Sequence, residues 1–162
     1  MLYDEPNRMA HFADDVVATP EAADEGWVLR SDKLDVMLEE RPAEGAKEVE
    51  GRSRIRRISA SGNATLHWGQ RHCKAAQIIR DWPLQVITLH GTNAEAATIW
   101  EEEGNSFKAP KIVASVNGEA VRADGPGELG IPDADGQQRA TVSYEGDAVY
   151  QVASGQMGKA VF

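Results

Sequence analysis

Short runs of alternating apolar and polar residues, separated by turn-forming residues, dominate the chain. Runs at 33–38, 139–144 and 147–152 each place every second residue, an apolar one, on the same face, which is the period of a β-strand. A run at 84–89 is apolar on both faces, so we expect a strand that is covered from both sides. The pattern predicts an all-β sandwich, barrel or solenoid with strands of about 5–7 residues. Turn signals lie at Gly62-Asn63, Gly91-Thr92-Asn93, Gly104-Asn105, Asn117-Gly118 and Asp135-Gly136.

Residues 92–103 also carry a helix signal. Thr92-Asn93-Ala94-Glu95 has the form of a capping box, and an Ala-rich sequence follows it. Against a helix, Thr98-Ile99-Trp100 is β-prone, and the acidic run Glu101–Glu103 before Gly104 suits a hairpin tip. Local propensity leaves helix and strand open, and internal repetition favours the strand.

Self-comparison of the chain reveals a duplicated unit. Residues 29–38 align with 107–116, so that Lys33 matches Lys111 and the alternate apolar positions coincide. Residues 58–66 align in the same way with 121–129, and 2–12 have a looser echo in 78–89. A further start lies at 149–162. We therefore expect a single array with approximate repeats at 1–75, 76–138 and 139–162, in which neighbouring units stack and share one core.

The aligned segments resemble a known family. In residues 1–64 the order Met-x-Tyr-Asp, Ala-x-Phe, Val-Val-Ala-Thr, Gly-Trp-x-Leu-Arg-Ser-Asp-Lys-Leu-Asp-Val-x-Leu and Ile-x-x-Ile-x-Ala-x-Gly-Asn-Ala is similar to the OstA-like repeat. Residues 97–112 resemble the hairpin of the same unit. The family comprises periplasmic lipopolysaccharide-transport proteins of the LptA and LptC type and the soluble part of LptD. Long insertions at 39–54 and 130–138 are typical of a divergent, multi-repeat member, and the apolar chain ends suggest a fragment of a longer protein.

The resemblance implies an open β-jellyroll, or V-shaped β-solenoid, with an apolar slot that holds acyl chains. It also implies a non-enzymatic protein without a cofactor, located in the periplasm or at the outer membrane, whose ligand is lipopolysaccharide or another acylated lipid. Each methylene removed from water contributes about 0.8 kcal/mol, so an apolar slot can hold such chains. The same inward-facing residues could equally form a filled core without a ligand. We expect the slot to be lined by Leu34, Val36, Leu38, Ile87, Leu89, Ile112, Ala114 and Val116.

Free strand edges at the two ends of such an array predict a second kind of partner. Unpaired edges can add strands from homologous β-jellyroll units, which would give head-to-tail self-association or a bridge.

The net charge of the chain limits the classes of partner that it can bind. Seventeen Lys and Arg against 26 Asp and Glu give a net charge of −9, which argues against binding of nucleic acid or an anionic membrane surface. The local exception is the basic run Arg52, Arg54, Arg56 and Arg57. Its guanidinium groups could contact lipid phosphates, because arginine suits bidentate phosphate contacts. Alternatively they form a solvated strand edge that discourages aggregation.

Catalytic and metal-binding interpretations find little in the sequence. His67, His72, Cys73 and His90 lack the spacing of a metal site, and neighbours on a strand point to opposite faces. Asp133-x-Asp135-Gly136 begins like a calcium loop but lacks its remaining ligands, so we expect a turn. A lone Cys73 excludes an internal disulfide.

Three classes of function remain at this point. The first, which the resemblance favours, is a lipid-binding or bridging module of the envelope. The second is a purely structural β-solenoid segment with a filled core and no ligand. The third is a carbohydrate-active β-helix enzyme, which would need carboxylates from adjacent strands about 5–9 Å apart.

Overall fold

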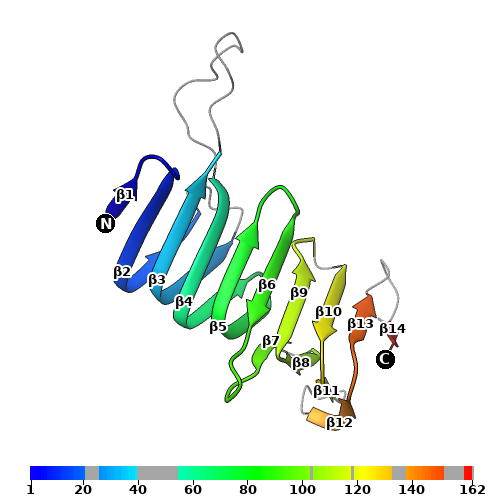
Figure 1. Cartoon of the computed structure of the whole chain (residues 1–162). Coiled ribbons are helices and arrows are strands. Elements are labelled where there is room, and N and C mark those ends of the chain that lie inside the picture. Colours follow the sequence, from blue (N-terminus) through cyan, green and yellow to red (C-terminus); the bar gives the residue numbers. More distant parts are fainter. Residues whose placement is uncertain are drawn as a thin grey trace.

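The computed structural model describes residues 1–20, 26–39, 55–102, 104–117, 119–132, 138–151 and 159–161, which form fourteen antiparallel strands (Figure 1). Among these residues no helix is long and apolar enough to cross a bilayer. The strands are β1 (Leu2–Asp4), β2 (Met9–Ala18), β3 (Trp27–Leu38), β4 (Ile55–Trp68), β5 (Arg71–Asp81), β6 (Val86–His90), β7 (Ala97–Glu101), β8 (Ser106–Ala109), β9 (Lys111–Ser115), β10 (Ala120–Asp124), β11 (Gly127–Pro132), β12 (Gln138–Tyr144), β13 (Ala148–Gln151) and β14 (Lys159–Val161).

The strands lie in two layers that form a V. The first layer runs from β1 through one half of each of β2–β5 to β6, β9, β10, β13 and β14. The second layer contains the other halves of β2–β5, followed by β7, β8, β11 and β12. Figure 1 shows β2–β5 as long strands that fold over from one layer into the other. The core lies between the layers.

The long strands bend where the backbone leaves the extended conformation. In β2, Asp14 and Asp15 have φ of 70° and 55°, and in β4, Gly62 and Asn63 have φ of 75° and 46°. Small polar residues and glycine tolerate this left-handed region best. Asn63 Nδ2 donates to Asp32 Oδ2 across the bend at 3.1 Å, which joins β4 to β3. The bends form the closed side of the V, and the opposite side is open.

The sheet does not close on itself. β1 covers only Met9–His11 of the outer edge of β2, so within the described residues the stretch Phe12–Ala18 has a strand on one side only. At the other end, in the part of the chain that the structure describes, β14 pairs only with β13, and β12 only with β11. The predicted all-β, open β-jellyroll class is therefore confirmed.

The segments that align in sequence have the same strand pairing. Leu34 pairs with Ala60, and the matching Ile112 pairs with Ala123. In the second layer Leu29 pairs with Leu66, as Phe107 pairs with Leu129. Gly62 and Gly125, which also match in the alignment, both have a positive φ at the turn from one layer to the other. We refer below to residues 1–75 as the first unit and to 76–138 as the second unit.

Two local predictions have clear outcomes. The segment 92–103 is not helical: Thr92 Oγ1 accepts the backbone N–H groups of Ala94 and Glu95 in a short turn, and β7 then begins at Ala97. The predicted strand at 84–89 was placed too early, because β6 begins at Val86. Leu84 lies in the preceding turn, where its N–H bonds to Asp81 Oδ1 and its side chain is 67% exposed. Because Leu84 is apolar, the sequence pattern counted it as part of the strand and not of the turn.

Candidate functional site

The V contains an apolar chamber of about 960 Å³ at its amino-terminal end. A volume of this size is at the upper end of the range for small-molecule sites. Residues of both layers and of the turn before β6 form its walls, and it opens on the open side of the V. The chamber is lined by Ala10, Phe12, Val16, Val17, Ala18, Thr19, Pro20, Trp27, Leu34, Val36, Glu39, Ile55, Ile58, Trp82 and Pro83.

Alternation along three neighbouring strands produces the chamber walls. In the first layer Ala10, Val36 and Ile58 are directly paired on β2, β3 and β4, so their side chains share the inner face. The wall of the second layer comes from the end of β2 and from Trp27 at the start of β3. Glu39 is the sole acidic residue among the lining residues, so the environment suits hydrocarbon far better than a charged ligand.

The turn that carries Trp82 and Pro83 forms one rim of the chamber and is held by Asp81. Arg57 donates two hydrogen bonds to Asp81 Oδ2, from Nη2 at 2.6 Å and from Nε at 3.0 Å. The other carboxylate oxygen accepts the N–H of Leu84 at 3.1 Å. Burial alone would raise the pKa of the Asp81 carboxyl, but the Arg57 and Leu84 hydrogen bonds hold this pKa below its ordinary value. Asp81 therefore stays charged and fixes the rim.

Two further contacts hold Trp82 itself. The backbone N–H of Trp82 donates to the backbone carbonyl of Arg56 at 3.0 Å, and the Arg80 guanidinium lies 4.7 Å from the centre of the Trp82 indole ring. Arg80 pairs with Ile58 on one side and Ile87 on the other, so it lies on the inner face at the boundary of the chamber.

Beyond that boundary the interior is filled. Phe107 from the second layer and Tyr150 from the first layer meet with their ring centroids 5.5 Å apart. Asn105 Nδ2 donates to the Tyr150 hydroxyl at 2.9 Å, which links the β7–β8 turn to β13 across the open side of the V. The two layers are thus in direct contact where Phe107 of the second unit meets Tyr150 of the following repeat. The chamber lies between the layers of the first unit, with Trp82 and Pro83 of the second unit at its rim.

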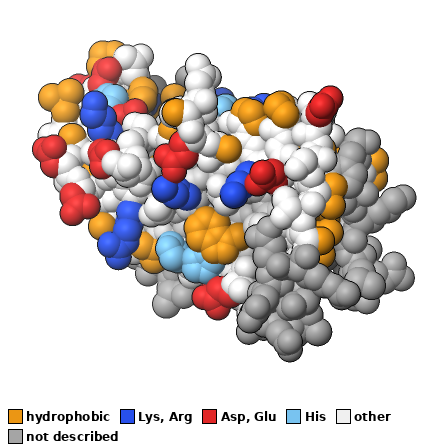
Figure 2. All heavy atoms as spheres, turned by 90° about the horizontal axis from the view of Figure 1, so that it is seen from below, with side chains coloured by type: hydrophobic (Ala, Val, Ile, Leu, Met, Phe, Trp, Pro, Cys, Tyr) orange, Lys and Arg blue, Asp and Glu red, His pale blue; other side chains and the backbone are white. Residues whose placement is uncertain are grey.

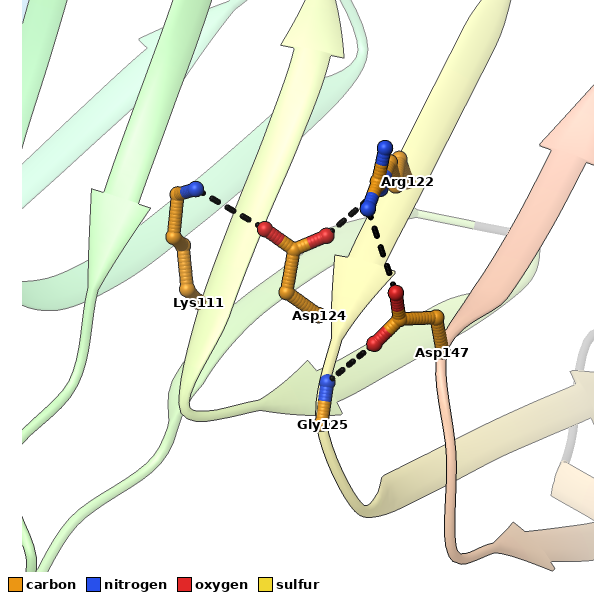
Figure 3. Close-up of polar contacts among 5 residues, drawn as sticks. All are labelled: Lys111, Arg122, Asp124, Gly125 and Asp147. Atoms are coloured by element: carbon orange, nitrogen blue, oxygen red, sulfur yellow. Dashed lines mark hydrogen bonds and ion pairs between the residues drawn. The ribbon is translucent and has the colours of Figure 1, made fainter.

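An ion-pair network holds the closed side of the second unit (Figure 3). Asp124 accepts from Lys111 Nζ at 2.8 Å and from Arg122 Nε at 2.6 Å. Arg122 also reaches Asp147, whose other oxygen accepts the Gly125 N–H at 2.9 Å. The hydrogen bond from Lys111, against a smaller opposing effect of burial, keeps the pKa of Asp124 below its usual range. The network joins β9, β10 and the start of β13.

The predicted slot residues divide into three groups. Leu34 and Val36 line the chamber. Leu38 is half-buried at the end of β3 and does not line it. The remaining positions face the interior of the second unit, and they are fully buried in the core or, for Val116, packed against it: Ile87, Leu89, Ile112, Ala114 and Val116.

Of the four predicted phosphate-contacting arginines, Arg52 and Arg54 lie outside the described residues. Arg56 and Arg57 follow the chamber residue Ile55 on β4 and are exposed. The turn expected at Asp133–Gly136 also lies outside the described residues.

Sequence reasoning missed most of the chamber. Ala10 and Phe12 alternate as a strand face should, but the small Ala10 and the irregular run at 13–15 weaken the signal. Trp82 and Pro83 lie in the turn before β6, where no site residue was predicted. The available signal for this part of the chamber was a tryptophan followed by a proline at a turn.

The outer face of the second layer is polar, with histidines beside a large hydrophobic side chain (Figure 2). His67 and His72 are cross-strand neighbours whose rings meet edge to face at 4.5 Å, and His72 stacks on Trp100 at 5.3 Å. In the part of the chain that the structure describes, no three His, Cys, Asp or Glu side chains are placed to hold a metal ion. Cys73 points inward, and burial raises the pKa of its thiol to about 12, which leaves it unreactive.

Comparison with known proteins gives a match at the level of structure. No protein-family model matches the chain, and no curated protein matches it. The chain is similar to the crystal structure of LptH from Pseudomonas aeruginosa, the LptA-homologous periplasmic component of its lipopolysaccharide transport device. The TM-score is 0.53 at 13% sequence identity, and the match covers 88% of this chain and 99% of LptH. This similarity establishes an LptA-like fold.

Proposed function

We propose that this protein is a non-enzymatic lipid-binding module of the bacterial envelope. Its ligand is lipopolysaccharide or another acylated lipid, and the acyl chains lie in the chamber. The observation that carries the proposal is the apolar, open-sided volume of about 960 Å³ between the two layers. The LptA-like fold supports the same function and a periplasmic or outer-membrane location.

The energetics of the chamber favour hydrocarbon. Each methylene that moves from water into an apolar site gains about 0.8 kcal/mol, so a chain of moderate length supplies enough free energy for specific binding. The polar part of the lipid stays at the open side of the V. There Arg56 and Arg57 follow a lining residue, and we propose them, with Arg52 and Arg54, as contacts for lipid phosphates.

The free edge of β2 supports a bridging role. Among the described residues, Phe12–Ala18 presents backbone N–H and C=O groups along an edge that has a strand on one side only. An edge strand of a homologous unit, or of a second copy, can pair there and extend the array. Light scattering should show a mass that rises with concentration, and a constant monomer mass would contradict self-association.

Tryptophan positions allow a direct test of lipid binding. Trp82 lines the chamber, whereas Trp100 lies on the outer face beside His72. Bromine quenches indole fluorescence only at short range, so titration with dibromostearate should quench the wild-type emission. Trp82→Phe should remove part of this quenching, and the matched control Trp100→Phe should leave it. Unlabelled lipopolysaccharide should reverse the effect.

A second candidate function is supported by the filled second unit. A structural β-solenoid segment with no ligand would need a dry core, and the packing of Phe107 against Tyr150 of the following repeat provides one there. The same titration separates the two functions. No quenching, or quenching that depends equally on both tryptophans, would favour the structural segment.

A further inference from the structure

The two units match in strand pairing, and at two inward positions the first unit has an alanine where the second has a larger side chain. The opposite difference occurs beside them, because Val36 corresponds to Ala114 and Phe12 to Leu89. On the first layer Ala10 pairs with Val36, and at the matching place in the second unit Ile87 pairs with Ala114. On the second layer Ala18 pairs with Leu29, whereas Ile99 pairs with Phe107. At each of the two places an alanine in the first unit therefore corresponds to an isoleucine in the second.

This difference in size coincides with the difference in packing. Ala10 and Ala18 both line the chamber, one from each layer. Ile87 and Ile99 are buried in the core of the second unit, with exposures of 1% and 3%. Larger side chains at facing positions close the space between the layers, and small ones leave it open because the backbone of a packed sheet does not collapse to fill the gap.

A second observation concerns the interior further along the array, beyond the chamber. Where Arg80 pairs with Ile58 at the chamber boundary, Tyr150 pairs with Val121 at the matching place further on. Tyr150 packs on Phe107 and accepts a hydrogen bond from Asn105 of the opposite layer. The interior is therefore closed by side chains from both layers.

We propose that Ala10 and Ala18 determine the capacity of the chamber, and that the second unit acts as a stop behind it. The chamber is then single-ended: a chain enters with its methyl terminus and cannot run on through the second unit. This inference rests on the proposed function and specifies its ligand class as amphiphiles whose inserted hydrocarbon is of limited length. It also makes the two alanines specificity-determining residues.

Chain length provides the first readout. In a series of saturated fatty acids that compete with dibromostearate, affinity should rise about fourfold per methylene until the chamber is full and should then level off. A rise that continues through the longest soluble chains would overturn the stop. Ile87→Ala combined with Ile99→Ala removes buried side chains from β6 and β7, the strands next to β5 at the chamber boundary. This variant should move the plateau to longer chains, provided that thermal unfolding shows it to be folded.

Substitution of the alanines provides the second readout, which does not depend on a weakened core. Ala10→Ile with Ala18→Ile introduces the side chains that the second unit already carries at matching places, and should weaken dibromostearate binding at least about tenfold. Ala13→Ile is the matched control, because Ala13 lies on the same strand and is exposed. It should leave binding unchanged.

The outcomes distinguish the two proposals. If the wild-type protein does not bind dibromostearate, the proposed function fails. If it binds, and the folded A10I/A18I variant binds equally well, the proposed function stands and the role of the two alanines is refuted. A drop in affinity for A13I as large as that for A10I/A18I would refute it as well.

Discussion

Replacing Asp81 should destabilise the protein and loosen the rim of the chamber. The carboxylate is 8% exposed and accepts three hydrogen bonds, two from Arg57 and one from the Leu84 N–H. Asp81→Asn keeps an oxygen for Leu84 but removes the charge that faces Arg57. Asp81→Ala removes both functions, and the backbone of the turn then loses its acceptor.

The two variants should differ by a definite amount. A hydrogen bond to a charged group contributes about 1.5–3 kcal/mol, and the half-exposed Arg57 places this pair at the lower end. We expect Asp81→Asn to lower the free energy of unfolding by about 2 kcal/mol. Loss of the Leu84 hydrogen bond adds about 1 kcal/mol in Asp81→Ala. Both should weaken dibromostearate binding, because the Trp82–Pro83 turn is no longer held against the chamber.

Urea denaturation followed by circular dichroism gives the free energies, and a double-mutant cycle with Arg57→Met isolates the pair. The control is Glu95→Gln, which removes an exposed ion pair with Lys74 and should change stability by less than about 0.5 kcal/mol. If Asp81→Asn is as mild as this control, or if Asp81 and Arg57 show no coupling, the assigned role of Asp81 is incorrect.

Three other predictions follow from local geometry. Gly62→Ala should lower the free energy of unfolding by about 1–3 kcal/mol, because φ is positive and the added Cβ would lie 2.9 Å from the Cβ of Asp32. Gly69→Ala, also at positive φ but with no atom within 4 Å of the added Cβ, should lower it less, as measured by urea denaturation. Cys73, with a thiol pKa of about 12, should react with iodoacetamide at pH 8 only after unfolding, and rapid labelling of the folded protein would contradict its burial. Because folding lowers the pKa values of Asp81 and Asp124, their contribution to stability is present above the unfolded pKa of about 3.9 and is lost as pH falls below it; thermal melts should show a smaller acid-induced loss for Asp81→Asn than for the wild type.

Alternation of apolar residues was sufficient to predict an all-β fold and most of its strands, but it left sandwich, barrel and solenoid open. The open two-layer arrangement was predicted from the family resemblance. Leu34 and Ile112 face inward as their runs require, and the aligned segments share their strand pairing. A two-residue period reports which face a side chain occupies, and matching glycines report where the chain turns from one layer to the other. Both signals are local, so a single sequence contains them.

The chamber could not be predicted in the same way. The same alternation that places Val36 on the chamber wall places Ala114 in a filled core. Whether an inward face meets space or another side chain depends on the distance between the layers and on the residues opposite, such as Ala18 or Ile99. That relation joins positions far apart in sequence, and only the pairing register reveals it.

The continuous course of β2–β5 through both layers limits how the first unit can change shape. A sandwich of separate sheets can accommodate a bulkier guest by sliding one sheet over the other. Here β2, β3 and β4 each run through both layers, so sliding would break the ladders on both sides of the bend. The space between the layers can instead widen only through the angle at the bends of β2, β3 and β4. The width of the ligand that fits is therefore set by how far those bends can open.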